Sequence, residues 1–333
     1  MPADSTTGIG TLRTRVASTA RVWSADSAVR RGLQFVAILI LAVILYFFVQ
    51  LAVAAMPVIG KMGIVGFVFD NNWDIAHTIF GAWPLVIGTL ITSVIALIIG
   101  VPVAVAAALY ITELAPARMR GVLALLLDLL AAIPSVVYGL WGVFILIPVL
   151  KPIEQWFADT FHFLPFIGGV VYGPNYFIAG LILAIMIIPI VSAISREVLS
   201  TVPLAEKEAA LALGATRWEM MRLAVLPHSR AGIASASMLG LGRAIGETIA
   251  VTLVIGNAAV IGDSLFSQGY TLAAVIANEF GETETGGIHA SALIAAGLVL
   301  FILTLVINGV ARAMVLRKVG KPTTGSIADR AVA

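Results

Sequence analysis

The arrangement of the chain follows from the sequence Glu206-Lys207-Glu208-Ala209-Ala210-Leu211-Ala212-Leu213-Gly214-Ala215-Thr216-Arg217-Trp218-Glu219, which continues to Leu226-Pro227. This polar stretch, residues 195–230, separates two long apolar blocks. Alanine and leucine after Glu208 favour a short amphipathic helix that ends near Gly214, because glycine adopts the left-handed C-terminal conformation without a steric penalty. Thr216 is expected to cap a second short helix, which Pro227 would end. The stretch is therefore predicted to form two short helices joined at a glycine.

The composition excludes a water-soluble protein. Hydrophobic residues make up 60% of the 333 residues, charged residues only 11%, and the mean hydropathy is +1.05. A soluble domain of this length could not bury so much apolar surface, so the chain is predicted to be an integral membrane protein in contact with lipid. It has no cysteine and four scattered histidines, so disulfides, thiolate nucleophiles and metal sites are not expected. No nucleic-acid partner is expected either.

The apolar blocks predict an all-α polytopic membrane protein. Each predicted span has at least the roughly 20 residues that a helix needs to cross the hydrocarbon core. The six expected spans are residues 33–56, 83–112, 122–150, 176–194, 232–261 and 290–315. The third span is expected to bend or break at Ile133-Pro134. The expected organisation is a flexible N-terminal tail (1–32), a first transmembrane helix (33–56), a core (80–315) containing the loop 195–230, and a C-terminal tail (316–333).

Lysine and arginine are distributed very unevenly between the two sides of these spans. Loops on one side carry Arg13, Arg15, Arg21, Arg30, Arg31, Arg118, Arg120, Arg196, Lys207, Arg217, Arg222, Arg230, Arg312, Arg317, Lys318, Lys321 and Arg330. The opposite loops carry only Lys61 and Lys151. Because cytoplasmic loops are enriched in these residues, both termini and residues 195–230 are predicted to be cytoplasmic. Residues 56–82, 151–175 and 262–289 would then lie outside.

One of the outer segments, residues 151–176, is rich in aromatic side chains. Tryptophan and tyrosine favour the boundary between lipid and water, so a short interfacial helix and turn is one interpretation. A docking face for an extracytoplasmic partner is the other, and the sequence leaves both open.

Three ionisable residues lie well inside predicted spans: Asp128, Arg243 and Glu247. Such residues are costly in lipid and are therefore candidates for function. Asp128 lies near the cytoplasmic end of its span, and we expect it to pair with a neighbouring helix or loop. Arg243 lies about 16 Å along a helix that starts near Gly232, close to the bilayer centre.

Glu247 follows Arg243 by four residues, which on a continuous helix places both on one face. The pair could be purely structural, or Arg243 could line an anion pathway, since a guanidinium stays charged and offers several donors to an oxyanion. Gly242 and Gly246 form a face of small residues that allows another helix to approach closely. We favour the anion pathway.

The polar stretch also carries a motif. The spacing of Glu208-Ala209-Ala210, Gly214 and Leu226-Pro227 resembles the EAA loop of bacterial ABC importer permeases, with Ala224 standing where that family usually has isoleucine. The resemblance implies that Glu208, Ala209, Ala210, Gly214, Leu226 and Pro227 belong to an element that docks into a groove of a cytoplasmic ATPase.

Two further segments indicate which importer permeases the chain resembles most. Residues 133–142 and 240–252 look like the PstC-type permease of the high-affinity phosphate importer, and residues 84–90 and 113–116 fit the same family, so roughly 80–315 is covered. The resemblance implies a multi-pass subunit of the bacterial inner membrane that pairs with a sister permease on a dimeric ATPase. A binding protein outside would deliver phosphate. ATP would be used by the partner, with no cofactor bound by this chain.

Other functions remain open at this point. The chain could be the sister permease itself, or a permease for another oxyanion. A secondary transporter could share Arg243 and Glu247, but it would have no use for a coupling loop. A membrane-embedded transferase would need catalytic polar groups, and the sequence contains no HExxH motif, no GxSxG motif and no acidic metal cluster. We therefore expect a transport subunit without an active site.

Overall fold

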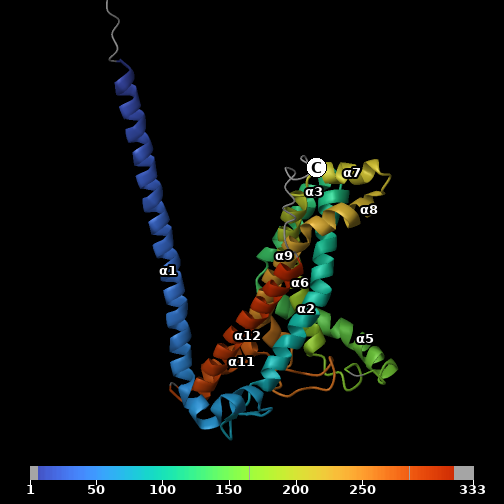
Figure 1. Cartoon of the computed structure of the whole chain (residues 1–333). Helices are drawn as coiled ribbons and strands as arrows, with labels where there is room; N and C mark the ends of the chain where they lie inside the picture. Colours follow the sequence, from blue (N-terminus) through green and yellow to red (C-terminus); the bar gives the residue numbers. More distant parts are fainter. Residues whose placement is uncertain (1–6, 165, 285, 319–333) are drawn as a thin grey trace, which may run out of the picture. The chain divides into compact units, whose positions relative to one another are not determined.

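A computed structural model describes residues 7–164, 166–284 and 286–318 (Figure 1). The elements are, in chain order, α1 (Thr7–Phe69), β1 (Trp73–Asp74), β2 (Ile79–Phe80), α2 (Trp83–Leu109), η1 (Tyr110–Leu114), α3 (Ala117–Ala132), α4 (Ser135–Trp141), η2 (Gly142–Leu146), α5 (Ile147–Thr160), α6 (Tyr176–Ser200), α7 (Leu204–Ala212), α8 (Arg217–Met220), η3 (Met221–Val225), α9 (Leu226–Gly246), α10 (Ile249–Val254), α11 (Leu272–Glu279), η4 (Phe280–Glu282) and α12 (Ile288–Lys318). The segments η1, η2 and η3 are π-helical, and η4 is a 3-10 turn. The described residues are thus mainly helical, as predicted.

The chain divides into two units, residues 1–54 and 55–333, and α1 begins in the first and ends in the second. In the first unit the helix starts at Thr7, where we had expected a flexible tail up to residue 32, and its apolar side chains from residue 33 onward are almost all exposed. The helix also continues beyond the predicted end at residue 56. Gly63, with φ +74°, interrupts its regular geometry before Phe69.

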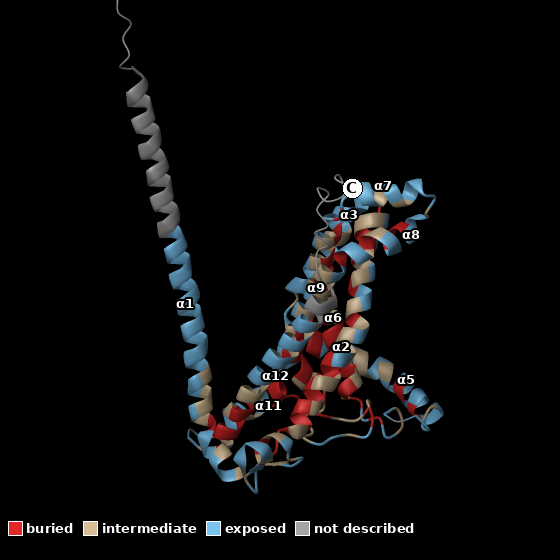
Figure 2. Cartoon of the chain, in the orientation of Figure 1, coloured by how far each residue is buried: buried red, intermediate tan, exposed pale blue. Residues whose placement is uncertain are grey.

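The second unit is built around three helices, α2, α6 and α9, that pack through glycines. A Cβ at Gly100 or Gly180 would lie within 3 Å of an isoleucine side chain on the neighbouring helix, and one at Gly232 would lie 2.3 Å from Val198. These glycines therefore allow the helix axes to approach closely, as small residues do in membrane bundles. Burial is concentrated along α2 and α6, where Figure 2 shows the largest buried region.

Five segments of the described chain are long and apolar enough to cross a membrane: Val29–Phe69, Trp83–Leu114, Ser135–Thr160, Tyr176–Ser200 and Ile288–Ala313. The predicted third span, 122–150, is wrong in position. The chain breaks at Ile133-Pro134, as expected, and the long apolar helix starts after the break at Ser135. Proline disfavours the helical conformation in the residue before it, and Ile133 is extended (φ −68°, ψ 127°), so α3 ends there. The helix then continues to Thr160, into the segment expected to lie outside.

The fifth predicted span, 232–261, is also interrupted, and it is not among these five segments. Helix α9 ends at Gly246, Glu247 is extended (φ −71°, ψ 130°), and α10 begins at Ile249. Three glycines within seven residues, the last of them Gly246, lower the helix propensity here. The short α10 packs against α4, since a Cβ at Gly139 would lie 3.0 Å from the Cα of Ala250. The two broken spans therefore meet near their breaks.

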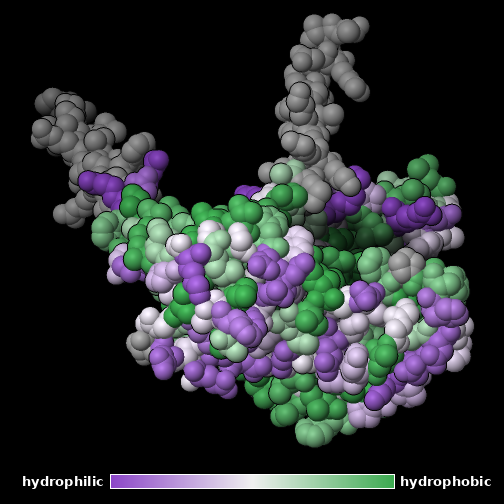
Figure 3. All heavy atoms as spheres, turned by 90° about the horizontal axis from the view of Figure 1, so that it is seen from below, coloured by the Kyte–Doolittle hydropathy of each residue, from purple (hydrophilic) through white to green (hydrophobic). Residues whose placement is uncertain are grey.

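The end of this unit opposite α7 and α8 consists of loops and a small hairpin. Strands β1 and β2 pair antiparallel, with Trp73 opposite Phe80. The Trp73 indole and the His289 imidazole both contact the Glu279 carboxylate, at 3.0 and 2.9 Å, which links the hairpin to α11 and α12. Hydrophilic and hydrophobic side chains are intermixed on the surface seen from below (Figure 3). The contacts of Trp73 and His289 with Glu279 therefore hold this end together.

Candidate coupling loop and substrate pathway

The loop between α6 and α9 begins with the two predicted short helices, which are joined at Gly214. Helix α7 ends at Ala212, and Gly214 takes the left-handed conformation with φ +88°. The Thr216 hydroxyl accepts from the Glu219 backbone N–H at 3.3 Å, and the Glu219 carboxylate accepts from the Thr216 backbone N–H at 2.8 Å. This reciprocal capping box starts α8. The Thr216 hydroxyl also donates to the Glu219 carboxylate at 2.9 Å, and the two hydrogen bonds that the carboxylate accepts from Thr216 favour its charged form and lower the pKa of Glu219.

Pro227 does not end the second helix, contrary to our prediction. The chain passes from α8 through η3 into α9 without leaving a helical conformation, and Pro227 lies in the first turn of α9. Proline is tolerated at such a position, and the π-helical turn before it pairs the Leu226 N–H with the carbonyl of Met221, five residues back. The loop is therefore continuous with the membrane helix that carries Arg243.

The loop has two apolar faces with different environments. Met220, Met221 and Val225 are buried in a cluster with residues at the ends of α2 and α6, including Ala108, Leu109, Leu199 and Val202. Leu213, Trp218 and Leu223 point outward and are 90%, 61% and 68% exposed. The inner face fixes the loop to the membrane bundle, and the outer face is available for a partner.

One ion pair and one histidine–carboxylate contact join α7 to the rest of this unit. Lys207 Nζ contacts Glu113 Oε1 at 2.6 Å, with side chains only 17% and 9% exposed. His228 Nδ1 at the start of α9 lies 3.3 Å from Glu206 Oε2, and both side chains are more exposed. Of the motif residues, Ala210 also packs against the apolar cluster, whereas Glu208 and Ala209 are exposed.

The second candidate site differs from its predicted geometry. Arg243 lies in the last turn of α9 and Glu247 lies beyond the end of that helix, so the two do not share a helical face. Within the described part of the chain they form no ion pair with each other. Arg243 is exposed and Glu247 is partly buried. The premise of an intrahelical Arg243–Glu247 pair is thus wrong, because the helix breaks between them.

Arg243 nevertheless lies close to both helix breaks. Its charge interacts with Tyr138 on α4, and the Tyr138 hydroxyl donates to the carbonyl of Leu130 at 2.8 Å. That carbonyl also accepts from the Ile133 N–H at 3.3 Å, so Tyr138 supplies a second donor where α3 ends. A cation in the last turn of α9 is also favoured by the helix dipole. Sequence reasoning missed Tyr138, although it belongs to the quoted segment 133–142.

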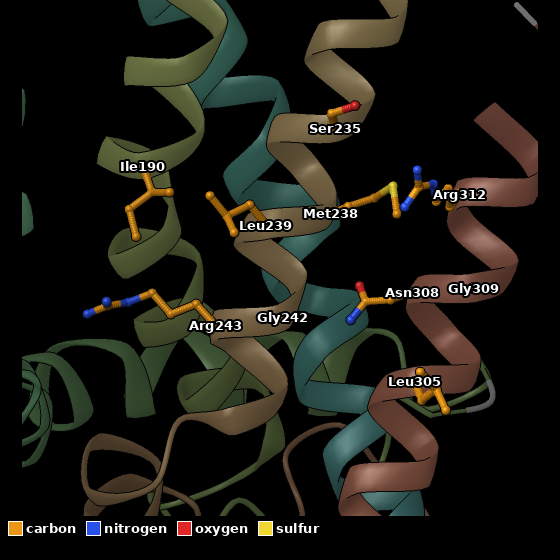
Figure 4. A pocket seen from close by; sticks show the side chains of 10 residues that line it. All are labelled: Ile190, Ser235, Met238, Leu239, Gly242, Arg243, Leu305, Asn308, Gly309 and Arg312. Atoms are coloured by element: carbon orange, nitrogen blue, oxygen red, sulfur yellow. The ribbon is translucent and has the colours of Figure 1, made fainter. Parts of the chain in front are cut away.

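A groove of about 780 Å³ runs between α6, α9 and α12 and includes Gly242 and Arg243 in its lining. Figure 4 shows Asn308 and Arg312 on α12 across from α9, and it shows the Arg243 side chain directed away from them. A Cβ at Gly242 or Gly246 would meet no atom within 4 Å. A side chain added at either glycine would therefore face open space in the described residues, unlike one at Gly232.

Asp128 pairs with a neighbouring helix, as predicted. Its Oδ1 lies 2.9 Å from Nη2 of Arg196 on α6. The described residues contain no group of three or more histidine, aspartate or glutamate side chains placed to hold a metal ion.

The helical membrane fold and its amphipathic loop are those of a transport permease. The chain belongs to the family described as binding-protein-dependent transport system inner membrane component, whose model matches residues 100–319. It is 44% identical to the phosphate transport system permease protein PstC of Pasteurella multocida, over 75% of this chain and 79% of that protein. It is 46% identical to the phosphate transport system permease protein PstC 2 of Mycobacterium tuberculosis, over 75% and 78%.

The fold agrees with a solved structure. A chain from a bacterial ABC transporter involved in the import of the acidic polysaccharide alginate matches with a TM-score of 0.55 at 21% identity, over 90% of this chain and all of that one. The family match and these relatives confirm the resemblance to importer permeases. The chain is a multi-pass inner-membrane permease subunit and not an enzyme.

Proposed function

We propose that this chain carries inorganic phosphate across the bacterial cytoplasmic membrane as a subunit of an ATP-driven importer. The observation that carries the proposal is the identity of 44% and 46%, over three quarters of the chain, to permeases named for phosphate transport. ATP is hydrolysed by a separate partner, and this chain binds no cofactor. Both termini and the loop 195–230 face the cytoplasm in this proposal, on the strength of the lysine and arginine asymmetry.

The outer face of the loop is the proposed docking element for the ATPase. Leu213, Trp218 and Leu223 expose apolar surface on a water-facing loop, and such a patch gains free energy when a partner covers it, at about 25 cal/mol per Å². The capping box and the left-handed Gly214 hold the two short helices in one arrangement before docking. A dimeric ATPase would receive this chain and a sister permease side by side, and an extracytoplasmic binding protein would supply phosphate.

The proposed substrate pathway passes Arg243. Extended backbone at membrane depth, as at Glu247, is tolerated only where protein buries it or where it lines a water-filled cavity. Arg243 is exposed on this chain, and Gly242 and Gly246 leave room beside it. The sister permease would complete this face. The guanidinium then replaces part of the hydration of phosphate, and the nearby charge of Glu247 keeps the anion from binding too tightly to leave.

ATP dependence and anion selectivity test the proposal. Proteoliposomes containing the complex, with ATP on the ATPase side, should accumulate labelled phosphate in the presence of a protonophore. Excess unlabelled phosphate should compete, and excess sulfate should not. Uptake that persists without ATP and stops with the protonophore would identify a secondary transporter. Equal competition by sulfate would make the chain a general oxyanion permease.

A further inference from the structure

Helix α7 is attached to the membrane bundle by very few contacts. None of its residues is fully buried, and its contribution to the apolar cluster is the half-buried Ala210. Its shortest polar contact is the 2.6 Å ion pair between Lys207 and Glu113, which are separated by 94 residues in sequence. By contrast, the following segment, α8 and η3, is anchored by Met220, Met221 and Val225. The two short helices are thus held by different forces.

Glu113 lies in η1, the π-helical end of the membrane helix α2. The turn after it is fixed by hydrogen bonds from the Ala115 N–H to the Tyr110 carbonyl and from Arg120 Nε to the Ala115 carbonyl. The Glu113 carboxylate therefore sits on a well-ordered support. Because its side chain is only 9% exposed, loss of Lys207 would leave a charge that water reaches poorly.

The two kinds of contact differ in what they transmit. An apolar contact is non-directional and allows small sliding movements. A short ion pair holds two particular atoms together, and it is directional because the ammonium donates to one carboxylate oxygen. A displacement of α7 would therefore move the end of α2, which packs along α6 through Gly100 and Gly180.

We propose that the Lys207–Glu113 pair is the tether that transmits movement of α7 to α2, so that ATPase movement at the loop becomes movement of the membrane helices. Lys207 and Glu113 are positioning residues and touch neither nucleotide nor phosphate. The proposal rests on the proposed function, because it assigns a mechanical role within an ATP-driven permease.

The first test replaces the charges within the complete complex. Glu113→Gln and Lys207→Met should assemble and hydrolyse ATP, while phosphate transported per ATP hydrolysed falls at least about fivefold, the lower end of usual coupling factors. Asp128→Asn is the matched control, since Asp128–Arg196 also joins two helices of this unit by a charge pair but does not involve α7. Its transport ratio should stay at the wild-type value.

The second test restores the connection without charges. The chain has no cysteine, so Glu113→Cys with Lys207→Cys can be cross-linked selectively in a complex whose other subunits are cysteine-free. The uncross-linked variant should be uncoupled. A flexible bifunctional methanethiosulfonate reagent of about the length of the two removed side chains should restore the ratio, because α7 and the end of α2 again move together.

Three results would overturn the tether. The first is a wild-type ratio of phosphate to ATP in the uncross-linked cysteine variant. The second is an uncoupled variant whose ratio cross-linking does not restore. The third is loss of assembled complex in every variant, which would make the pair a folding contact. A wild-type complex without phosphate uptake would instead overturn the proposed function. If the wild-type complex takes up phosphate and the variants keep the wild-type ratio of phosphate transported to ATP hydrolysed, only the tether hypothesis is rejected.

Discussion

The conformation of Gly214 allows a graded test of the loop. Its φ of +88° lies in the region that L-residues avoid, and a Cβ there would meet nothing within 4 Å. Substitution is therefore opposed by backbone strain alone and not by a clash with neighbours. Alanine should cost about 1–2 kcal/mol, asparagine less because it tolerates this region, and a β-branched valine more, at about 2–3 kcal/mol. Each 1.4 kcal/mol shifts the loop equilibrium about tenfold away from its native geometry.

The assay is phosphate-stimulated ATP hydrolysis by the reconstituted complex, normalised to assembled protein. Phosphate stimulation of ATP hydrolysis should decrease in the order glycine, asparagine, alanine and valine at position 214. Assembly should be similar in all four, because the loop is a small part of the fold and its inner cluster is untouched. Wild-type coupling in Gly214→Val, or equal losses for asparagine and valine, would refute the link between this conformation and coupling.

Three further predictions concern the pathway, the topology and the packing. Arg243→Met with Glu247→Leu should assemble but lose phosphate uptake per assembled complex, and near-normal uptake would leave Arg243 without a role in the pathway. A cysteine at the exposed Ser200 should react with an impermeant thiol reagent only from the cytoplasmic side, so labelling of intact cells from outside would overturn the orientation. Gly232→Ala should lower the thermal midpoint of the purified complex, since its Cβ would lie 2.3 Å from Val198 and overpacking typically costs about 1–3 kcal/mol. Gly242→Ala, its matched control with open space, should leave the midpoint unchanged or raise it, and equal effects would contradict the packing described for α6 and α9.

The local geometry of the loop could be predicted because short-range rules determine it. Gly214 and Thr216 act through their own backbone and that of residues two or three positions away, so their roles follow from the sequence. The fate of Pro227 could not be predicted in the same way. Whether a proline ends a helix or stands in the first turn of the next depends on the preceding hydrogen bonds, and here a π-helical turn joins the two segments.

The membrane site was predicted less completely. Hydropathy reports only whether a segment is apolar, so it gave no sign of the break at Glu247, where glycines that lower the helix propensity had been interpreted as a packing face. The electrostatic interaction between Arg243 and Tyr138 arises where the two broken helices meet. The Lys207–Glu113 pair joins residues 94 positions apart, and no periodicity in one sequence reveals such a contact.

The most direct measurement of the central claim is labelled phosphate uptake into proteoliposomes that contain the ATPase, the sister permease and the binding protein, with and without this chain. Uptake should require this chain and ATP together, and it should be restored by adding the chain before reconstitution. ATP-dependent uptake of the same rate in vesicles that lack the chain would contradict its assignment as a phosphate permease subunit.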